Sequence, residues 1–162
     1  MRHRSGFLLF LAVLGLDQLT KWSALAWLDP VRPVEVTPFF NLVLVWNRGV
    51  SFGMFARAPE WGPWALVLLT LVIAAVLIVW LRRETRALSR AALWLVLAGA
   101  AGNLIDRLRF GAVVDFLDFH VQDYHWPAFI VADSAIVGGR ALLLLDGIVL
   151  SRAAVQNAPE KG

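Results

Sequence analysis

The sequence contains no cysteine, and only 17% of its 162 residues are charged. The absence of cysteine excludes disulfides, thiolate metal sites and a cysteine nucleophile. Against this, 59% of the residues are hydrophobic, and the mean hydropathy is +0.68. A soluble domain of this length is rarely so apolar, so the composition predicts a polytopic membrane protein formed by one domain over residues 1–162.

The net charge of +3 raises the question of nucleic acid as a partner. The basic residues cluster at the ends of apolar segments and form no continuous stripe, which argues against nucleic-acid binding. Such clustering is typical of membrane topology. We therefore expect membrane lipids to surround this chain, and we expect no nucleic acid among its partners.

Four apolar runs approach or reach the roughly 20 residues that a helix needs to cross a bilayer. They predict an all-α membrane protein with four transmembrane helices, at about 7–28, 63–81, 91–108 and 128–150. The first run follows Arg2 and Arg4 and resembles a signal peptide. Because Asp17, Gln18 and Lys21 interrupt it and three more runs follow, we interpret it as a retained helix.

The distribution of Lys and Arg predicts the orientation of the helices. Eight basic residues fall on one side of the expected membrane: Arg2, Arg4, Arg82, Arg83, Arg86, Arg90, Arg152 and Lys161. Four fall on the other side: Arg32, Arg48, Arg57 and Arg109. Both termini are therefore expected in the cytoplasm. Segments 29–62 and 109–127 are expected to face outward.

The outer segment 29–62 alternates and is rich in Val, Phe and Trp, which is typical of short strands. We predict a small β-cradle here, lying on the outer membrane surface because open sheet edges are not tolerated in hydrocarbon. Tryptophans near the predicted outer helix ends are expected to form an interfacial belt; they are Trp22, Trp27, Trp61, Trp64 and Trp126.

Ionisable residues within spans are costly and often functional. Asp17 and Lys21 are four residues apart, on one helix face. They either form an ion pair that orients the first helix, or Lys21 and Gln18 belong to a site at its outer end. The residues alone leave both readings open.

The stretch "AGNLIDRLRFG" places three polar residues, Asn103, Asp106 and Arg107, on one face of the third helix. An aspartate beside an arginine is most often a paired, ionised carboxylate with a structural role. On chemistry alone we favour a scaffold role for Asp106.

Two further carboxylates lie in apolar sequence at the same expected membrane depth. Asp115 follows the third helix and Asp133 opens the fourth, whereas Asp118 and Asp123 are expected in a solvated loop. Two close carboxylates ionise in separate steps and share a proton between them. This suits aspartic proteolysis, in which one carboxylate activates water and its protonated partner polarises the carbonyl. Hydrogen bonding between helices is the structural alternative.

Other hydrolytic chemistries have less support. The sequence has no His-Glu-x-x-His motif, and Ser134 lacks a G-x-S-x-G setting. His120 and His125 flank a loop and are expected at the membrane interface, with metal binding as an alternative. We predict no metal site.

Five motifs in order resemble one family, the bacterial lipoprotein signal peptidases, also called signal peptidase II. They are "DQLTK" (17–21), "WNRGVSFG" (46–53), "GNLIDR" (102–107), "VVDF" (113–116) and "ADSAI" (132–136). The resemblance implies an aspartic endopeptidase of the bacterial inner membrane with four helices and an extracytoplasmic β-cradle. It implies cleavage of diacylglyceryl-modified prolipoproteins just before the modified cysteine, by a monomer with no cofactor and an active site near the outer face.

Carried over by motif, the catalytic pair is Asp115 and Asp133. The supporting or substrate-binding positions are Asn47, Gly49, Asn103, Asp106, Arg107, Asp17 and Lys21.

Two positions depart from the family pattern. Ile130 stands where the pattern Phe-Asn-x-Ala-Asp has asparagine, and it is expected to share a helix face with Asp133. Arg140 stands among residues that are normally small and apolar, and it is expected to pair with Asp17 or Asp146, or to reach the interface. Both departures suggest reduced activity.

Two alternatives accompany this interpretation. One is a catalytically impaired homologue that still binds lipoprotein precursors. The other is a small proton-coupled transporter that uses Asp133 and Arg140. The sequence shows none of the internal symmetry that such transporters often have.

Overall fold

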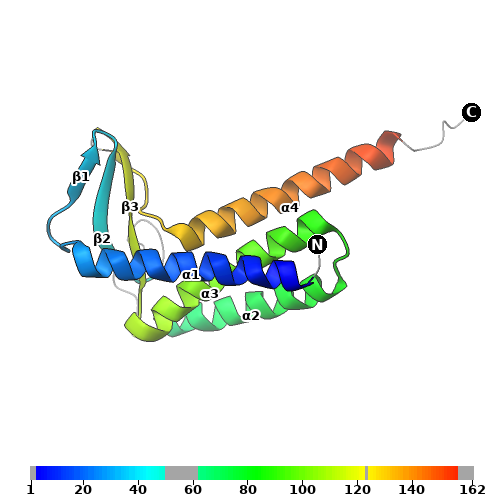
Figure 1. The fold of residues 1–162 in the computed structure, drawn as a ribbon, viewed down its shortest axis with the longest axis horizontal. Coiled ribbons are helices and arrows are strands. Elements are labelled where there is room, and N and C mark those ends of the chain that lie inside the picture. Colours follow the sequence, from blue (N-terminus) through cyan, green and yellow to red (C-terminus); the bar gives the residue numbers. More distant parts are fainter. Residues whose placement is uncertain (1–2, 50–61, 123, 157–162) are drawn as a thin grey trace, which may run out of the picture.

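The computed structural model describes residues 3–49, 62–122 and 124–156. The elements in chain order are α1 (His3–Trp27), β1 (Val34–Thr37), β2 (Phe40–Asn47), α2 (Gly62–Arg83), α3 (Ala87–Phe110), β3 (Val113–Val121), β4 (Tyr124–His125) and α4 (Val131–Gln156). The helices lie side by side, and the sheet lies at the end where α1 and α3 finish and α4 starts (Figure 1).

Among the described residues, three helices are long and apolar enough to cross a membrane: Arg4–Trp27, Gly62–Arg83 and Ala87–Phe110. This confirms the prediction of a membrane protein. The fourth helix, α4, is 26 residues long and carries Asp133, Arg140 and Asp146. That it also spans the membrane remains a prediction.

Most helices extend beyond the predicted apolar runs because polar residues continue them. Helix α3 begins at Ala87, four residues before the apolar run, so that Ser89 and Arg90 lie in its first turn. It ends at Phe110 and is capped by Gly111, whose φ of 68° is left-handed and whose N–H donates to the Arg107 carbonyl at 3.0 Å. Glycine is the residue that most readily adopts this conformation at a helix end.

Helix α3 is the centre of the bundle and packs against α1, α2 and α4. Small residues let its neighbours approach. A Cβ at Gly99 would overlap the Ala132 carbonyl on α4, and one at Gly102 would overlap the Asp17 carboxylate on α1. Close approach at small residues is a common way for helices to pack in membranes.

The sheet is antiparallel with the strand order β1-β2-β3-β4. Its register places Val45 opposite Asp115 and Asn47 opposite Val113. The predicted β-cradle was confined to 29–62, but half of the strands come from 113–125, which was predicted as an outer loop. Residues 50–61 of the predicted cradle lie outside the described part of the chain.

An apolar cluster joins this sheet to the helices. Its buried members come from α1, β3 and the start of α4: Ala24, Val113, Phe116, Ile130 and Ala132. The cluster fixes β3 and the start of α4 against the C-terminal half of α1. The two segments that carry Asp115 and Asp133 are therefore held against the same helix.

Candidate active site

Asp115 lies in the middle of the site, on β3, and only 2% of it is exposed. The Asn47 amide donates from Nδ2 to its Oδ2 at 2.9 Å. The Asn47 Oδ1 in turn accepts the Gly49 N–H at 3.0 Å. Gly49 has a φ of 151°, which other residues rarely adopt. The turn after β2 therefore orients one amide toward one carboxylate.

Asp133 lies in the first turn of α4 and is partly buried. Asn103 on α3 donates from Nδ2 to its Oδ1 at 3.1 Å. A carboxylate in the first turn also interacts favourably with the positive end of the helix. The two aspartates thus have the same arrangement, each with an asparagine amide from a different element.

The two carboxylates are electrostatically coupled. Burial raises the pKa of Asp115 to about 7, the Asn47 hydrogen bond opposes this, and the Asp133 carboxylate raises the pKa further. The Oδ1 of Asp115 is buried, and no residue in the described ranges hydrogen-bonds to it. A pair of this kind retains one proton near neutral pH and has a free oxygen with which to bind a reactant.

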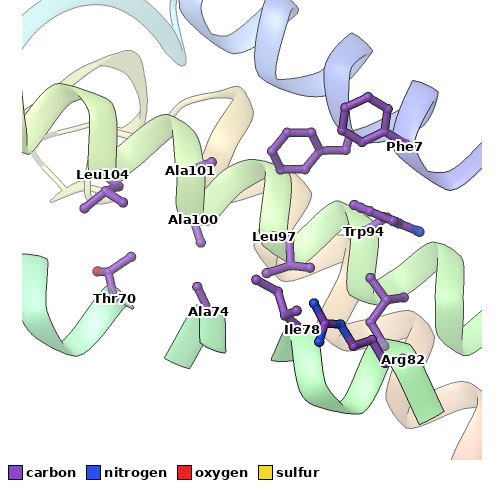
Figure 2. Close-up of a pocket in the computed structure, with 12 residues that line it drawn as sticks. Phe7, Thr70, Ala74, Ile78, Arg82, Trp94, Leu97, Ala100, Ala101 and Leu104 are labelled. Atoms are coloured by element: carbon purple, nitrogen blue, oxygen red, sulfur yellow. The ribbon is translucent and has the colours of Figure 1, made fainter. Parts of the chain in front are cut away.

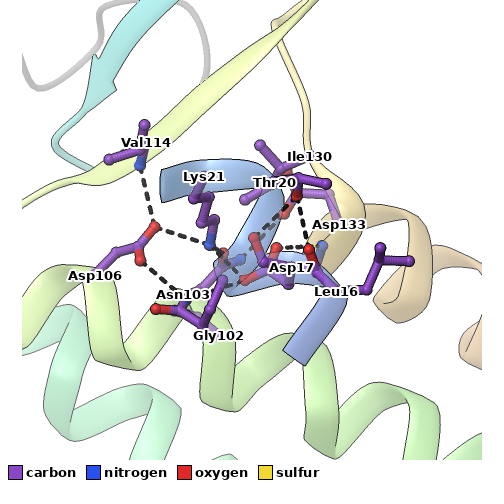
Figure 3. Close-up of polar contacts among 12 residues, drawn as sticks. Leu16, Asp17, Thr20, Lys21, Gly102, Asn103, Asp106, Val114, Ile130 and Asp133 are labelled. Atoms are coloured by element: carbon purple, nitrogen blue, oxygen red, sulfur yellow. Dashed lines mark hydrogen bonds and ion pairs between the residues drawn. The ribbon is translucent and has the colours of Figure 1, made fainter. Parts of the chain in front are cut away.

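Behind the pair, Lys21 joins two further carboxylates (Figure 3). Its Nζ lies 2.8 Å from Asp17 Oδ2 and 2.8 Å from Asp106 Oδ2, and only 1% of the residue is exposed. The same Nζ donates to Asn103 Oδ1 at 3.4 Å. Lys21 therefore also orients the amide that holds Asp133.

Each of these carboxylates binds the backbone just before a candidate catalytic aspartate. Asp17 Oδ1 accepts the Ala132 N–H at 2.9 Å, and Asp106 Oδ2 accepts the Val114 N–H at 3.2 Å. Ala132 precedes Asp133, and Val114 precedes Asp115. Through these contacts one buried cation is connected to both candidate catalytic segments. We call Lys21, Asp17 and Asp106 the lysine bridge.

Both readings of Asp17 and Lys21 describe part of this arrangement, since Lys21 forms the ion pair and also contacts Asn103 beside the candidate pair. The burial of Lys21 excludes direct contact with a large ligand in this conformation. Gln18 adds hydrogen bonds to Asp17 Oδ2 at 3.2 Å and to Asp106 Oδ1 at 3.3 Å. Gly102 begins the motif "GNLIDR" but was not among the predicted site residues, although its missing side chain makes room for the Asp17 carboxylate.

Arg107 has a different partner from the one expected. Asp106 pairs with Lys21, whereas the Arg107 Nη1 donates to the Asn103 carbonyl at 3.4 Å. The Arg107 guanidinium is still close enough to Asp133, Asp115 and Asp106 to interact with their charges. It thus adds positive charge beside the candidate pair.

The prediction that Asp118 is solvated is wrong. Asp118 is 6% exposed; it accepts a hydrogen bond from Asn41 at 3.3 Å, and its Oδ2 lies 2.9 Å from His125 Nδ1. His120 and His125 stack across β3 and β4, with their ring centroids 4.8 Å apart. In the described residues, no group of three or more His, Cys, Asp or Glu could hold a metal ion. Asp123 lies outside the described residues.

Ile130 does not lie on the expected helix face, and Arg140 forms neither of its expected ion pairs, which leaves its third expected outcome of reaching the interface. Helix α4 begins at Val131, so Ile130 precedes the helix, and its fully buried side chain packs in the apolar cluster. Arg140 is exposed. Its expected partners are engaged elsewhere, because Asp17 pairs with Lys21 and Asp146 pairs with Arg86 at 2.9 Å.

Comparisons with known proteins agree with the motifs. The family model described as signal peptidase (SPase) II matches residues 9–149. A lipoprotein signal peptidase of Paraburkholderia phymatum is 49% identical over 144 residues, covering 88% of this chain and 86% of the relative. One of Aeromonas hydrophila is 47% identical over 151 residues, covering 90% of each.

Two solved structures have the same fold. Both are described as bacterial membrane enzymes determined by the in meso method. One superposes with a TM-score of 0.81 at 26% identity and covers 99% of this chain and 95% of its own. The other has a TM-score of 0.78 at 28% identity, with coverages of 89% and 92%.

Proposed function

Since the chain belongs to the signal peptidase II family, we propose that it is an aspartic endopeptidase of the membrane that removes signal peptides from diacylglyceryl-modified prolipoproteins. The observation that carries this proposal is the pair of Asp115 and Asp133. Each accepts a hydrogen bond from an asparagine amide, and the two are electrostatically coupled.

In the proposed mechanism the pair holds one proton, mainly on Asp115, because burial raises its pKa to about 7. Protonated Asp115 donates a hydrogen bond to the scissile carbonyl oxygen. Ionised Asp133 takes a proton from the attacking water, and that proton passes to the leaving amine as the C–N bond breaks.

The remaining polar residues position the pair. Asn47 and Gly49 orient Asp115, Asn103 orients Asp133, and the lysine bridge holds the backbone before each of them. Arg107 compensates the negative charge at the pair. A water-poor site with fixed donors of this kind favours charge development in the transition state.

We place the protein in the bacterial inner membrane as a monomer, with four spans, both termini in the cytoplasm and the active site near the outer face. The start of α1 and the far end of α4 lie opposite the sheet (Figure 1). Arg82 and Arg83 end α2 on the same side, as the positive-inside rule requires of a cytoplasmic end. The sheet then lies on the extracytoplasmic surface, where exposed Trp46 on β2 is placed to contact substrate or lipid.

The proposed function can be tested with purified protein and a prolipoprotein prepared with and without the diacylglyceryl group. We expect the modified precursor to be cut just before the modified cysteine and the unmodified one to remain intact, as followed by mass spectrometry. Equal cleavage of both would contradict the proposed substrate class. Failure to cleave either, together with substrate-dependent proton flux in liposomes, would support a transporter instead.

We also propose that Ile130 lowers the catalytic rate. The Ile130 carbonyl accepts the Ser134 N–H at 3.1 Å, so Ile130 stands at the N-cap of α4. An asparagine side chain at this position accepts the N–H of the second or third helical residue, here Ala132 or Asp133. Asp17 already binds the Ala132 N–H, so the native chain supplies part of this cap from α1. Since Arg140 is exposed, we assign the reduced rate to Ile130 rather than to Arg140.

Ile130→Asn should therefore raise kcat by about tenfold, equivalent to lowering the barrier by about 1.4 kcal/mol, because the added cap fixes the turn of α4 that carries Asp133. It should also lower the melting temperature, because an amide replaces an apolar side chain in the cluster. The matched control is Ile130→Leu, which keeps the apolar packing and offers no hydrogen bond. A kcat for Ile130→Asn no higher than that of Ile130→Leu would show that position 130 does not limit the rate.

A further inference from the structure

Away from the candidate active site, an apolar cavity of about 540 Å³ lies between three helices (Figure 2). It is lined by Phe7 and Phe10 of α1, by Thr70, Ala74, Ile78, Leu81 and Arg82 of α2, and by Trp94, Leu97, Ala100, Ala101 and Leu104 of α3. Helices α1 and α2 pack on α3, and the cavity separates them. Its volume is within the usual range for small-molecule sites.

One end of this cavity is basic. Arg82 lies in the last turn of α2, and Figure 2 shows its side chain next to Ile78, at the opposite end from Thr70. The neighbouring Arg83 is about 100° further around the helix and does not line the cavity. Arg90 precedes the lining residue Trp94 by one turn on α3, but it does not itself line the cavity.

The carboxylates at this end of the bundle are engaged by another residue. Arg86 pairs with Glu84 at 3.3 Å and with Asp146 at 2.9 Å. Glu84 also accepts the Trp80 indole N–H, and Asp146 accepts the Ser89 hydroxyl. Within the described ranges neither Arg82 nor Arg90 has an ion pair, and the Nε and Nη2 of Arg90 are buried without a hydrogen-bond partner. Among the described residues, Arg82 therefore supplies an unpaired positive charge at one end of an apolar cavity.

We propose that this cavity binds one acyl chain of an anionic phospholipid, with the phosphate at Arg82. The apolar walls match the hydrocarbon chain, and the guanidinium matches the phosphate in charge and geometry. Basic pockets between membrane helices at the cytoplasmic surface commonly bind anionic headgroups. The lipid would fill the space between α1 and α2 and hold both against α3. It is distinct from the substrate, whose reactive bond must reach Asp115 and Asp133.

The test is native mass spectrometry of the purified protein after incubation with equal amounts of phosphatidylglycerol and phosphatidylcholine that have the same chains. The wild type should retain phosphatidylglycerol preferentially. Arg82→Gln should lower this preference about fivefold, the value of about 1 kcal/mol for one basic residue near anionic lipid. Arg83→Gln is the matched control, because it removes the same charge one residue away, outside the cavity. It should keep the wild-type preference.

A second variant tests the acyl-chain part. Ala101→Phe fills the cavity from α3 and should reduce retention of both lipids. Equal retention of the two lipids by the wild type would overturn headgroup recognition at Arg82. If Arg82→Gln and Arg83→Gln lower the preference for phosphatidylglycerol equally, the preference comes from general surface charge and not from Arg82. If Ala101→Phe retains both lipids as the wild type does, the acyl chain does not bind in this cavity. The conclusion on Arg82 stands even if Ala101→Phe fails to fold.

Discussion

Asp133→Asn and Asp115→Asn should each lower kcat for prolipoprotein cleavage by about 10⁴-fold, the upper range for loss of a general acid or base. Asparagine has the shape of aspartate and can still accept the amide hydrogen bond of Asn103 or Asn47. It cannot take a proton from water or share a proton with its neighbour. The loss should therefore appear in kcat, with little change in substrate binding or in melting temperature.

The matched control for these substitutions is Asp118→Asn. Asp118 is a buried carboxylate on the same strand as Asp115, and it too accepts a hydrogen bond from an asparagine amide, that of Asn41. If catalysis depends on the pair, Asp118→Asn should keep activity near that of the wild type. Comparable losses at 115 and 118 would mean that any buried carboxylate of this strand is needed for folding, and the catalytic assignment would fail.

The same pair predicts a pH dependence. The pKa of Asp115 is raised to about 7, mainly by burial, so its carboxyl is protonated below that pH and ionised above it. Since the mechanism needs one proton on the pair, cleavage should fall as the pH rises through about 7. It should also fall in acid, once both carboxyls are protonated. A rate that stays constant up to pH 9 would contradict the proposed role of Asp115.

Lys21→Met should cause the largest loss of stability of any single substitution at the site. Removing the cation leaves the Asp17 and Asp106 carboxylates buried without the lysine that pairs with them. Breaking a buried ion pair by removing one partner costs about 3–5 kcal/mol, a large part of the 5–15 kcal/mol that stabilises a typical protein. The measurements are the melting temperature of the purified protein and the kcat of the fraction that remains folded.

A triple variant separates unpaired charge from lost packing. In Lys21→Met with Asp17→Asn and Asp106→Asn no buried charge remains, while the asparagine oxygens can still accept the Ala132 and Val114 N–H groups. We expect it to recover most of the stability lost in the single variant, because a neutral replacement of a whole buried ion network is often tolerated. A triple variant as unstable as Lys21→Met would show that unpaired charge is not the cause.

The structure brings the candidate residues from the sequence motifs close together, but the sequence did not predict the contacts among them. Each candidate residue could be found from a motif of a few positions. The pairing of Asp106 was predicted wrongly because Arg107 is next in sequence, whereas adjacent residues on a helix point about 100° apart. Its partner Lys21 is on another helix, 85 positions earlier, and only the packing of α1 on α3 brings the two together.

Strand β3 was missed for a related reason. A half-exposed strand alternates between apolar and polar residues, but Val113, Val114, Asp115 and Phe116 are all buried, so no alternation is visible. The segment was therefore interpreted as the end of the third helix followed by a loop. The same burial explains why Asp118 was wrongly expected in water, since its partners Asn41 and His125 lie on the neighbouring strands.

The lysine bridge also limits how this site can change over generations. One cation pairs with two carboxylates, and each carboxylate holds the backbone before a different candidate catalytic residue. Losing one aspartate leaves Lys21 paired with the other, but the next step toward a neutral network leaves either Lys21 or the remaining carboxylate unpaired in the protein interior. Every mutational path to a neutral network therefore passes through an unstable intermediate. Substitutions that confer resistance to an inhibitor of the pair should therefore arise on the sheet, at positions such as Trp46, before they arise at Asp17, Lys21 or Asp106.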